Sequence, residues 1–250
     1  MGPPVLWQYN FSNFNEKARW ALDYKGIAHV RRSLLPNTPR AMLFSLRGTL
    51  PVLDLDGQRI VDSTLIIEAL ERRDPDRPLY PDNPAERQRA LELEEFFDEH
   101  AGHELRRAVF YESRHDLDYV SALLTTGRGA MTRRLYRAVM SVPGSAAYQT
   151  RRYRFYGADA ERARTQVAAA LYRIVAELQP SGYLVGTQFG VADLTAAALL
   201  FPLAWPPELQ YNYPAPPDSE LMNSLHGHPA IDWITEIYRR HRGSSMEIAR

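Results

Sequence analysis

The stretch that decides the fold reads Tyr9-Asn10-Phe11-Ser12-Asn13-Phe14-Asn15-Glu16-Lys17-Ala18-Arg19. The apolar run Val5–Trp7 precedes it and predicts a strand, and apolar residues at helical spacing follow it from Ala18 onward. Ser12 and Asn13 are favourable N-cap residues, so a helix should begin here. The first turn of a helix has unpaired N–H groups and a partial positive charge, which stabilise an anion such as a thiolate. The stretch therefore sets a hydroxyl beside a positive helix end, although a serine that only caps the helix fits the same pattern.

The composition excludes several classes of function. The 250 residues include 45% hydrophobic and 24% charged residues, as in an ordinary globular protein, and the 30 basic residues equal the 30 acidic ones. This balance gives no reason to expect nucleic acid or membrane as a partner. The chain has no cysteine, so any thiol chemistry must use a thiol that a ligand brings. The longest apolar run, Leu194–Trp205, is too short to cross a bilayer, and no signal peptide is evident, so we expect a cytoplasmic protein.

The first third of the chain alternates between strand and helix patterns. The predicted elements are a strand over His29–Leu35, one or two helical turns over Arg40–Arg47, hairpin strands over Thr49–Leu55 and Gln58–Val61, and a helix that opens at Asp62-Ser63. Asp56-Gly57 between the hairpin strands is a strong turn signal. The order strand, helix, strand, helix, hairpin, helix predicts an α/β layer structure, with a parallel pair extended by the hairpin and helices on both faces.

A linker divides this part from an all-α remainder. Asp74–Pro84 holds four prolines, and the composition changes after it. We therefore predict an N-terminal domain over residues 1–80 and a helical domain over residues 85–250. The predicted helices of the second domain are Ala85–Arg107, Asp159–Leu178, an apolar core helix that Gly190 caps and that Pro202 and Pro206 end, and Ala230–Arg240; Pro207–Ser219 is predicted to be a surface loop.

Two charged segments have both a functional and a structural interpretation. Acidic and histidine side chains between Glu94 and Glu104 could hold a metal ion, but we favour a solvated acidic face and expect no metal. Between Ser121 and Gly157 there are seven arginines and no acidic residue. That segment could bind an anionic partner, but we favour the interpretation that it neutralises the acidic helix before it.

Five motifs in order resemble the cytosolic glutathione transferase family. They are the strand–Ser12–helix junction with Lys17-Ala18-Arg19, Gly48-Thr49-Leu50-Pro51-Val52-Leu53, Asp62-Ser63 at a helix start, the linker through Leu79-Tyr80-Pro81, and Val191-Ala192-Asp193. The resemblance covers nearly all of residues 5–100 and again residues 180–205. It implies a thioredoxin-like N-terminal domain, an all-α C-terminal domain and a homodimer, with glutathione as co-substrate.

The resemblance also assigns roles to residues of this chain. It implies that Ser12 donates its hydroxyl to the glutathione sulfur, with Tyr9 as the competing candidate. It implies further glutathione contacts from Asn13, Phe14, Thr49, Leu50, Pro51, Asp62 and Ser63, with a cis Leu50–Pro51 bond. Ser63 offers a hydroxyl, an N–H and a helix dipole to the γ-glutamyl carboxylate, and Asp62 can pair with the adjacent amino group.

Three departures from the family pattern qualify this assignment. Position 49 is Thr where many members have a basic or amide residue, position 190 is Gly where Ser or Thr usually caps, and position 13 is Asn instead of Pro. The main hypothesis is transfer of glutathione to a small hydrophobic electrophile in detoxification, or a related lyase or isomerase reaction. The alternative is a non-catalytic scaffold of the same fold that uses the arginine-rich segment to bind a partner.

Overall fold

The computed structural model describes residues 2–36, 38–39, 41, 49–142 and 157–249. Its N-terminal part is built on one sheet with the strand order β2-β1-β3-β4. The strands are β1 (Val5–Gln8), β2 (Val30–Ser33), β3 (Val52–Leu55) and β4 (Gln58–Val61). β1 pairs in parallel with β2 and antiparallel with β3, and β3 and β4 form the predicted hairpin. The mixed α/β sheet predicted from the sequence is therefore confirmed.

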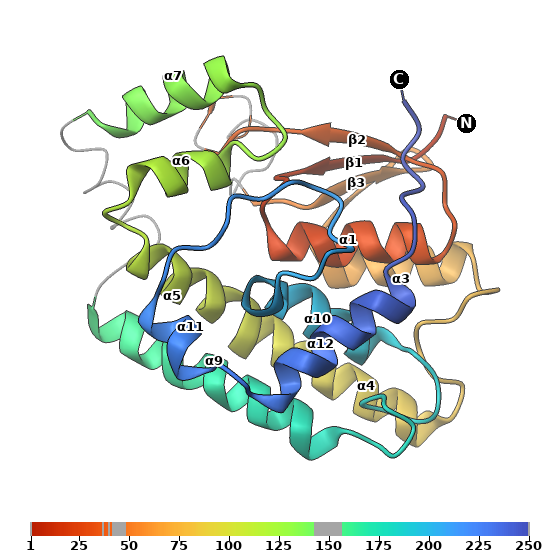
Figure 1. The fold of residues 1–250 in the computed structure, drawn as a ribbon. Coiled ribbons are helices and arrows are strands. Elements are labelled where there is room, and N and C mark those ends of the chain that lie inside the picture. Colours follow the sequence, from red (N-terminus) through yellow and green to blue (C-terminus); the bar gives the residue numbers. More distant parts are fainter. Residues whose placement is uncertain (1, 37, 40, 42–48, 143–156, 250) are drawn as a thin grey trace.

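Helices α1 (Asn13–Tyr24) and α3 (Ser63–Arg73) lie together on one face of this sheet (Figure 1). Leu6 points to that face and is completely buried in the main core, because alternate residues of a strand point to opposite faces. Trp7 and Tyr9 point to the other face, where they pack on a small cluster with Leu50. The helical turns predicted over Arg40–Arg47 fall almost entirely outside the described residues, so helical cover on this second face stays a prediction.

Every described element after α3 is also helical. These helices are α4 (Pro84–Phe97), the π-helical segment η1 (Asp98–Gly102), α5 (His103–Glu112), α6 (Leu117–Leu124), α7 (Ala130–Met140), α9 (Gly157–Glu177), α10 (Val191–Ala204), α11 (Glu220–Ser224) and α12 (Pro229–His241). α10 is apolar on all sides and almost fully buried, and it contacts α1, α4 and α12. It is therefore the core helix that the sequence predicts. The chain consequently has an α/β N-terminal part and a helical C-terminal part (Figure 1).

The structure corrects three details of the helical part. The acidic helix predicted to end near Arg107 extends to Glu112 and is interrupted by η1. Pro202 lies inside α10, which ends at Ala204, so only Pro206 follows the helix end. The segment Pro207–Ser219 has no regular structure, as predicted, but Leu209 and Tyr213 within it are half-buried against the main core and are not fully exposed.

The η1 segment lies against the start of α1. The Asn13 side chain donates hydrogen bonds to the carbonyls of Gly102 (3.1 Å) and Leu199 (3.0 Å), one in η1 and one in α10. A Cβ on Gly102 would lie 2.7 Å from the ring of Phe14, so only glycine permits this approach. The helical part thereby holds the first turn of α1 in place.

Candidate active site

One edge of the sheet gathers the three segments that the sequence singles out. Trp7 pairs with Val52, and Val52 pairs with Val61, both antiparallel. The end of β1, the start of β3 and the end of β4 therefore meet at that edge. The residues that extend beyond them are Tyr9–Ser12, Thr49–Pro51 and Asp62-Ser63. A hydrogen bond from Asn15 Nδ2 to the Leu50 carbonyl (3.3 Å) joins the first turn of α1 to the second of these segments.

Ser12 is the N-cap of α1, as predicted. Its φ of −80° and ψ of 130° are extended, and its carbonyl accepts the helical hydrogen bond from the Glu16 N–H (3.0 Å). Its hydroxyl makes no capping bond; the side chain of Asn13 accepts from the Phe14 N–H instead (3.0 Å). Ser12 therefore occupies the N-cap position and is half-buried, while its hydroxyl makes no hydrogen bond to the N–H groups of the first turn.

Tyr9, the competing candidate, lies three residues before Ser12 in the chain. Its ring stacks on Phe11 with 5.8 Å between centroids and packs on the cluster that contains Leu50. Phe11 in turn meets Phe110 of α5 edge to face at 6.3 Å. Tyr9 and Phe11 therefore continue an apolar wall from the sheet edge toward the helical part.

Asn13 and Phe14 are held by the helical part. Both amide hydrogens of the Asn13 side chain are directed to carbonyls of η1 and α10, so the predicted glutathione contact of Asn13 is left to its backbone N–H. The Phe14 ring lies 4.6 Å from the ring of His103, the first residue of α5. Although His103 is exposed, partial desolvation of its ring lowers its pKa, and the charge of Arg106 acts in the same direction.

Asp62 and Ser63 open α3. The Asp62 carboxylate accepts from the N–H groups of Thr64 (2.9 Å) and Leu65 (3.4 Å), so it is the N-cap. Its backbone φ is 92°, a conformation that non-glycine residues rarely adopt outside functional sites. Ser63 is buried, with 2% of its surface exposed. The Leu50–Pro51 bond opposite this pair is cis, as the family resemblance implies.

Lys17 ties three elements together behind the site. The completely buried Lys17 ammonium lies 2.9 Å from Glu94 and 2.7 Å from Asp98, and it donates to Thr64 Oγ1 (2.9 Å). Burial by itself lowers the Lys17 pKa, but the two carboxylates outweigh it and raise the pKa, so the group stays charged. Glu94 is buried, so the expectation of a solvated acidic face fails at this residue, whereas Glu95, Glu99 and His100 are exposed as expected. The described residues contain no group of three or more potential ligand side chains that could hold a metal ion.

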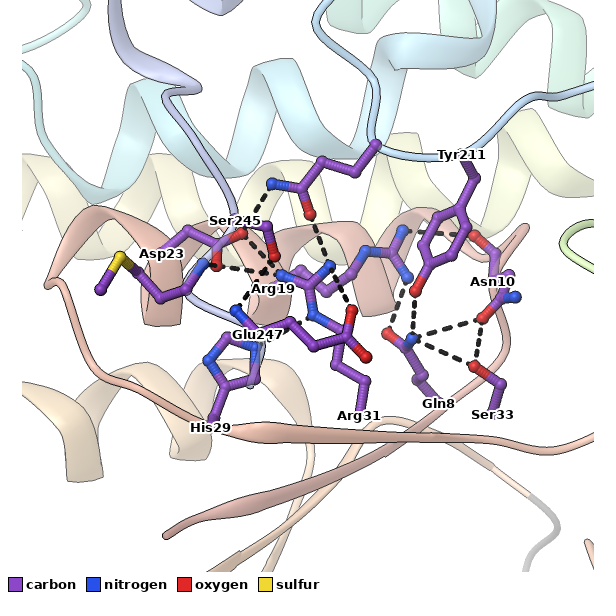
Figure 2. Close-up of polar contacts among 12 residues, drawn as sticks. Gln8, Asn10, Arg19, Asp23, His29, Arg31, Ser33, Tyr211, Ser245 and Glu247 are labelled. Carbon is purple, nitrogen blue, oxygen red and sulfur yellow. Dashed lines mark hydrogen bonds and ion pairs between the residues drawn. The ribbon is translucent and has the colours of Figure 1, made fainter. Parts of the chain in front are cut away.

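A buried polar network, which the sequence did not predict, surrounds the turn before Ser12 (Figure 2). Arg19 donates to Gln8 Oε1 (2.9 Å), to the Asn10 carbonyl (3.3 Å) and to Glu16 (2.8 Å). Gln8 Nε2 donates to the Tyr211 hydroxyl (2.7 Å), which comes from the segment predicted to be a surface loop. Arg19 thus joins the end of β1, the turn and α1. A polar Gln8 at an inward-facing strand position was the one signal in the sequence that could have revealed this network.

The arginine-rich segment has contacts other than those expected. Arg137 forms an ion pair with Asp118 of α6, and Arg128 donates to the carbonyl of Ser33 at the end of β2. Neither residue pairs with the acidic helix. The remaining arginines of the pattern include Arg151, Arg152 and Arg154, which lie outside the described residues.

Among the helices that the structure describes, none is long and apolar enough to cross a membrane.

Comparison with protein families gives two matches. A model described as "Glutathione S-transferase, N-terminal domain" matches residues 6–78, and one described as "Glutathione S-transferase, C-terminal domain" matches residues 144–240. Together the two matches cover more than half of the chain. The N-terminal match precedes the C-terminal one, in the order that the five sequence motifs predict, and residues 79–143 lie between them.

Comparison with individual proteins gives more distant similarities. The chain is 36% identical over 94 residues to maleylacetoacetate isomerase of Rhizobium meliloti (strain 1021), which covers 36% of this chain and 44% of that protein. It is 34% identical over 91 residues to a probable maleylacetoacetate isomerase of Caenorhabditis elegans, which covers 35% and 42% respectively. The chain therefore matches less than half of the length of these relatives.

Comparison with solved structures supports the fold. A glutathione S-transferase of Methylobacterium radiotolerans JCM 2831, solved with glutathione sulfonate, aligns with a TM-score of 0.62 at 18% identity. The alignment covers 99% of this chain and 96% of that one. At this identity the likeness concerns the fold alone.

Proposed function

The chain belongs to the glutathione S-transferase family, and on this premise we propose that it transfers glutathione to a small, hydrophobic electrophile. The observation that carries the proposal is the geometry at Ser12. Its hydroxyl lies at the positive end of α1 and is not used as a cap, since Asn13 accepts from the Phe14 N–H in its place. A hydroxyl in this position suits a hydrogen bond to a thiolate better than it suits a purely structural role.

The proposed chemistry is nucleophilic attack by the glutathione thiolate. A free thiol with a pKa of about 8.5 is only a few per cent ionised at neutral pH, so stabilising the thiolate raises the fraction that can react. The Ser12 hydroxyl donates to the sulfur, and the N–H groups of the first turn add positive potential. The sulfur forms a bond to the electrophilic carbon while the leaving group departs with its electron pair. The thiol proton is released to solvent when the thiolate forms, and the serine keeps its own proton, so no adjacent side chain has to act as a base.

Glutathione would bind along the sheet edge described above. Ser63 and the N–H groups at the start of α3 would hold the γ-glutamyl carboxylate, and Asp62 would pair with the amino group. The Leu50 backbone would pair with the cysteinyl backbone in the manner of an added strand, while Asn13, Phe14, Thr49 and Pro51 would complete the contacts. Tyr9 remains the alternative residue whose hydroxyl would donate a hydrogen bond to the glutathione sulfur.

The electrophile would lie on the side of Ser12 that faces α5 and α6. Phe11 there packs on a cluster whose buried members are Tyr119, Val120, Leu123, Leu124 and Met140. Phe14 and Phe11, on either side of Ser12, contact His103 and Phe110 of α5. This largely apolar wall is the reason to propose a hydrophobic substrate.

A second candidate is glutathione-dependent isomerisation. It is favoured by the two relatives whose names describe maleylacetoacetate isomerases. The two activities differ in their consumption of glutathione. A transferase consumes one glutathione for each product, whereas an isomerase leaves the glutathione concentration unchanged.

Calorimetry with glutathione followed by a panel of electrophiles tests the proposal. We expect saturable binding and turnover of at least one hydrophobic electrophile, and measurement of free thiol distinguishes transfer from isomerisation. Absence of glutathione binding would contradict the proposal. Binding without turnover of any electrophile or isomerisable substrate would favour the non-catalytic scaffold instead.

A further inference from the structure

We propose that Tyr213, in the loop after α10, is a positioning residue for Ser12, so that thiol activation depends on the helical part as well as on the N-terminal part. This inference rests on the proposed function of Ser12. It extends that function by assigning a role to a segment that the sequence predicts to be a surface loop.

The argument starts at Asn10, two residues before Ser12. Its carbonyl accepts from the Tyr213 hydroxyl (2.9 Å) and from the Arg19 guanidinium (3.3 Å). Its side-chain Nδ2 donates to the Thr126 carbonyl (2.8 Å), just after α6. Its Oδ1 accepts from Ser33 Oγ (2.5 Å) at the end of β2 (Figure 2). The polar groups of Asn10 are thereby fixed by four separate segments.

A glycine in the link between α6 and α7 permits the contact with Asn10. Gly127 follows Thr126 with a φ of +77°, and a Cβ on it would lie 2.6 Å from Asn10 Nδ2. A side chain at this position would therefore be strained and would push Asn10 away. The absence of a side chain lets the link between α6 and α7 approach the turn closely.

Tyr213 is itself rigidly held. Its ring lies 5.5 Å from the rings of both Phe201 and Trp205, at the end of α10. It also packs on the apolar cluster that Phe11 touches. The hydroxyl consequently has a fixed position relative to the core helix, and the hydrogen bond transmits that position to the Asn10 carbonyl.

Loss of the Tyr213 hydroxyl should affect the position of the Ser12 side chain more than the stability of the fold. Without the Tyr213 hydroxyl, the Asn10 carbonyl keeps the longer bond to Arg19, so the turn should persist with a less exact geometry. Displacement of a catalytic group by a fraction of an ångström to about 1 Å is enough to lower a rate by one to two orders of magnitude.

The test is Tyr213→Phe, which keeps the ring and removes only the hydroxyl. We expect kcat to fall on the order of tenfold and the pKa of the bound glutathione thiol to rise, with little change in the KM for glutathione. The matched control is Tyr183→Phe, which removes a hydroxyl that contacts Arg240 (2.7 Å) and His241 (3.0 Å), away from the turn. Tyr183→Phe should change neither kcat nor the pKa of the bound thiol.

A second variant, Gly127→Ala, approaches the same turn from α6 and should also lower kcat and raise the thiol pKa. A lower melting temperature with unchanged kcat and thiol pKa in Tyr213→Phe would overturn the inference and leave Tyr213 a structural role. The wild type serves as the reference for the proposed function. If wild-type protein does not lower the glutathione pKa, the proposed function fails; if it does and Tyr213→Phe behaves identically, only the inference fails.

Discussion

Asp62 has two functions in this account, since its carboxylate caps α3 and would also pair with the amino group of glutathione. Asp62→Asn keeps an oxygen that can cap and removes the charge. Combined with Ser63→Ala, it should weaken glutathione binding, because charge-assisted hydrogen bonds contribute on the order of 1.5–3 kcal/mol each. Titration calorimetry measures the effect. Unchanged affinity in a folded double variant would mean that the γ-glutamyl group does not bind at Asp62-Ser63.

Single residues with local roles could be predicted from the sequence, and those with distant partners could not. Ser12 and Asp62 occupy N-cap positions through contacts with residues two to four positions away, and a sequence pattern can predict such local contacts. The side-chain contacts of Asn13 depend on carbonyls 89 and 186 residues away. The Tyr213 contact with Asn10 spans 203 residues. No spacing rule reports contacts of this kind.

Among the elements, the cap of α10 gives a test in which the structure changes the expectation. Gly190 stands where the family usually has Ser or Thr, and by cap preference alone Ser would stabilise the helix by a few tenths of a kcal/mol. A Cβ at this position would lie 3.0 Å from the Leu79 carbonyl, which accepts from the Val191 N–H at 2.7 Å. Crowding of this kind costs about 1–3 kcal/mol. Gly190→Ser should therefore destabilise the protein in urea unfolding, and a gain in stability would contradict this account.

Element types were predictable where the sequence carries a turn signal or a cap. The β3–β4 hairpin follows from Asp56-Gly57, whose φ angles of 50° and 84° are those of a two-residue turn that only such residues adopt readily. The interruption at η1 has no comparable signal. It coincides with the close approach of Gly102 to Phe14, which is a tertiary contact. Pro202 likewise predicts a helix end from the sequence, whereas in the structure it lies within the buried helix α10.

For the molecule as a whole, a buried charge cluster fastens the end of the chain to the N-terminal part. Arg242 lies 2.5 Å from Glu16 and 3.0 Å from Asp23, and all three are almost completely buried. Arg31 also pairs with Asp23 (2.8 Å), and the Met246 N–H donates to that carboxylate (2.8 Å). The cluster therefore joins α1, β2 and the C-terminal segment.

Removing Arg242 should destabilise the fold, because breaking one partner of a buried pair costs about 3–5 kcal/mol. Arg242→Met tests this in chemical unfolding. Arg239→Met, which breaks an exposed pair with Glu236 on the same helix, is the control and should have no measurable effect.

The same cluster predicts a dependence on pH. Burial by itself raises the pKa of Glu16 and Asp23, but the guanidinium groups, Arg242 among them, outweigh burial and hold both pKa values below their usual range. Depressed folded-state values mean that the stabilisation is complete above about pH 4–5 and is lost as the pH falls below that range. The unfolding free energy of the wild type should therefore fall in acid, with a shallower fall in Arg242→Met. An equal fall in both would contradict the assignment.

Assembly is a prediction at the same scale. The family resemblance implies a homodimer, and light scattering in dilute solution should give twice the chain mass of 28.6 kDa. A monomer mass would show that this member departs from the expected assembly. The measurement is independent of the glutathione site, so neither result bears on the role of Ser12.

The most direct test of the central claim is the pKa of the glutathione thiol when bound to the wild type and to Ser12→Ala, followed by thiolate absorbance. We predict a pKa below the free value of about 8.5 in the wild type and a return toward that value in Ser12→Ala. kcat and kcat/KM should fall together on the order of 10²-fold, with binding nearly unchanged and Tyr9→Phe mild. The same thiol pKa in wild type and Ser12→Ala, or loss of turnover in Tyr9→Phe alone, would contradict the assignment of Ser12 as the activating residue.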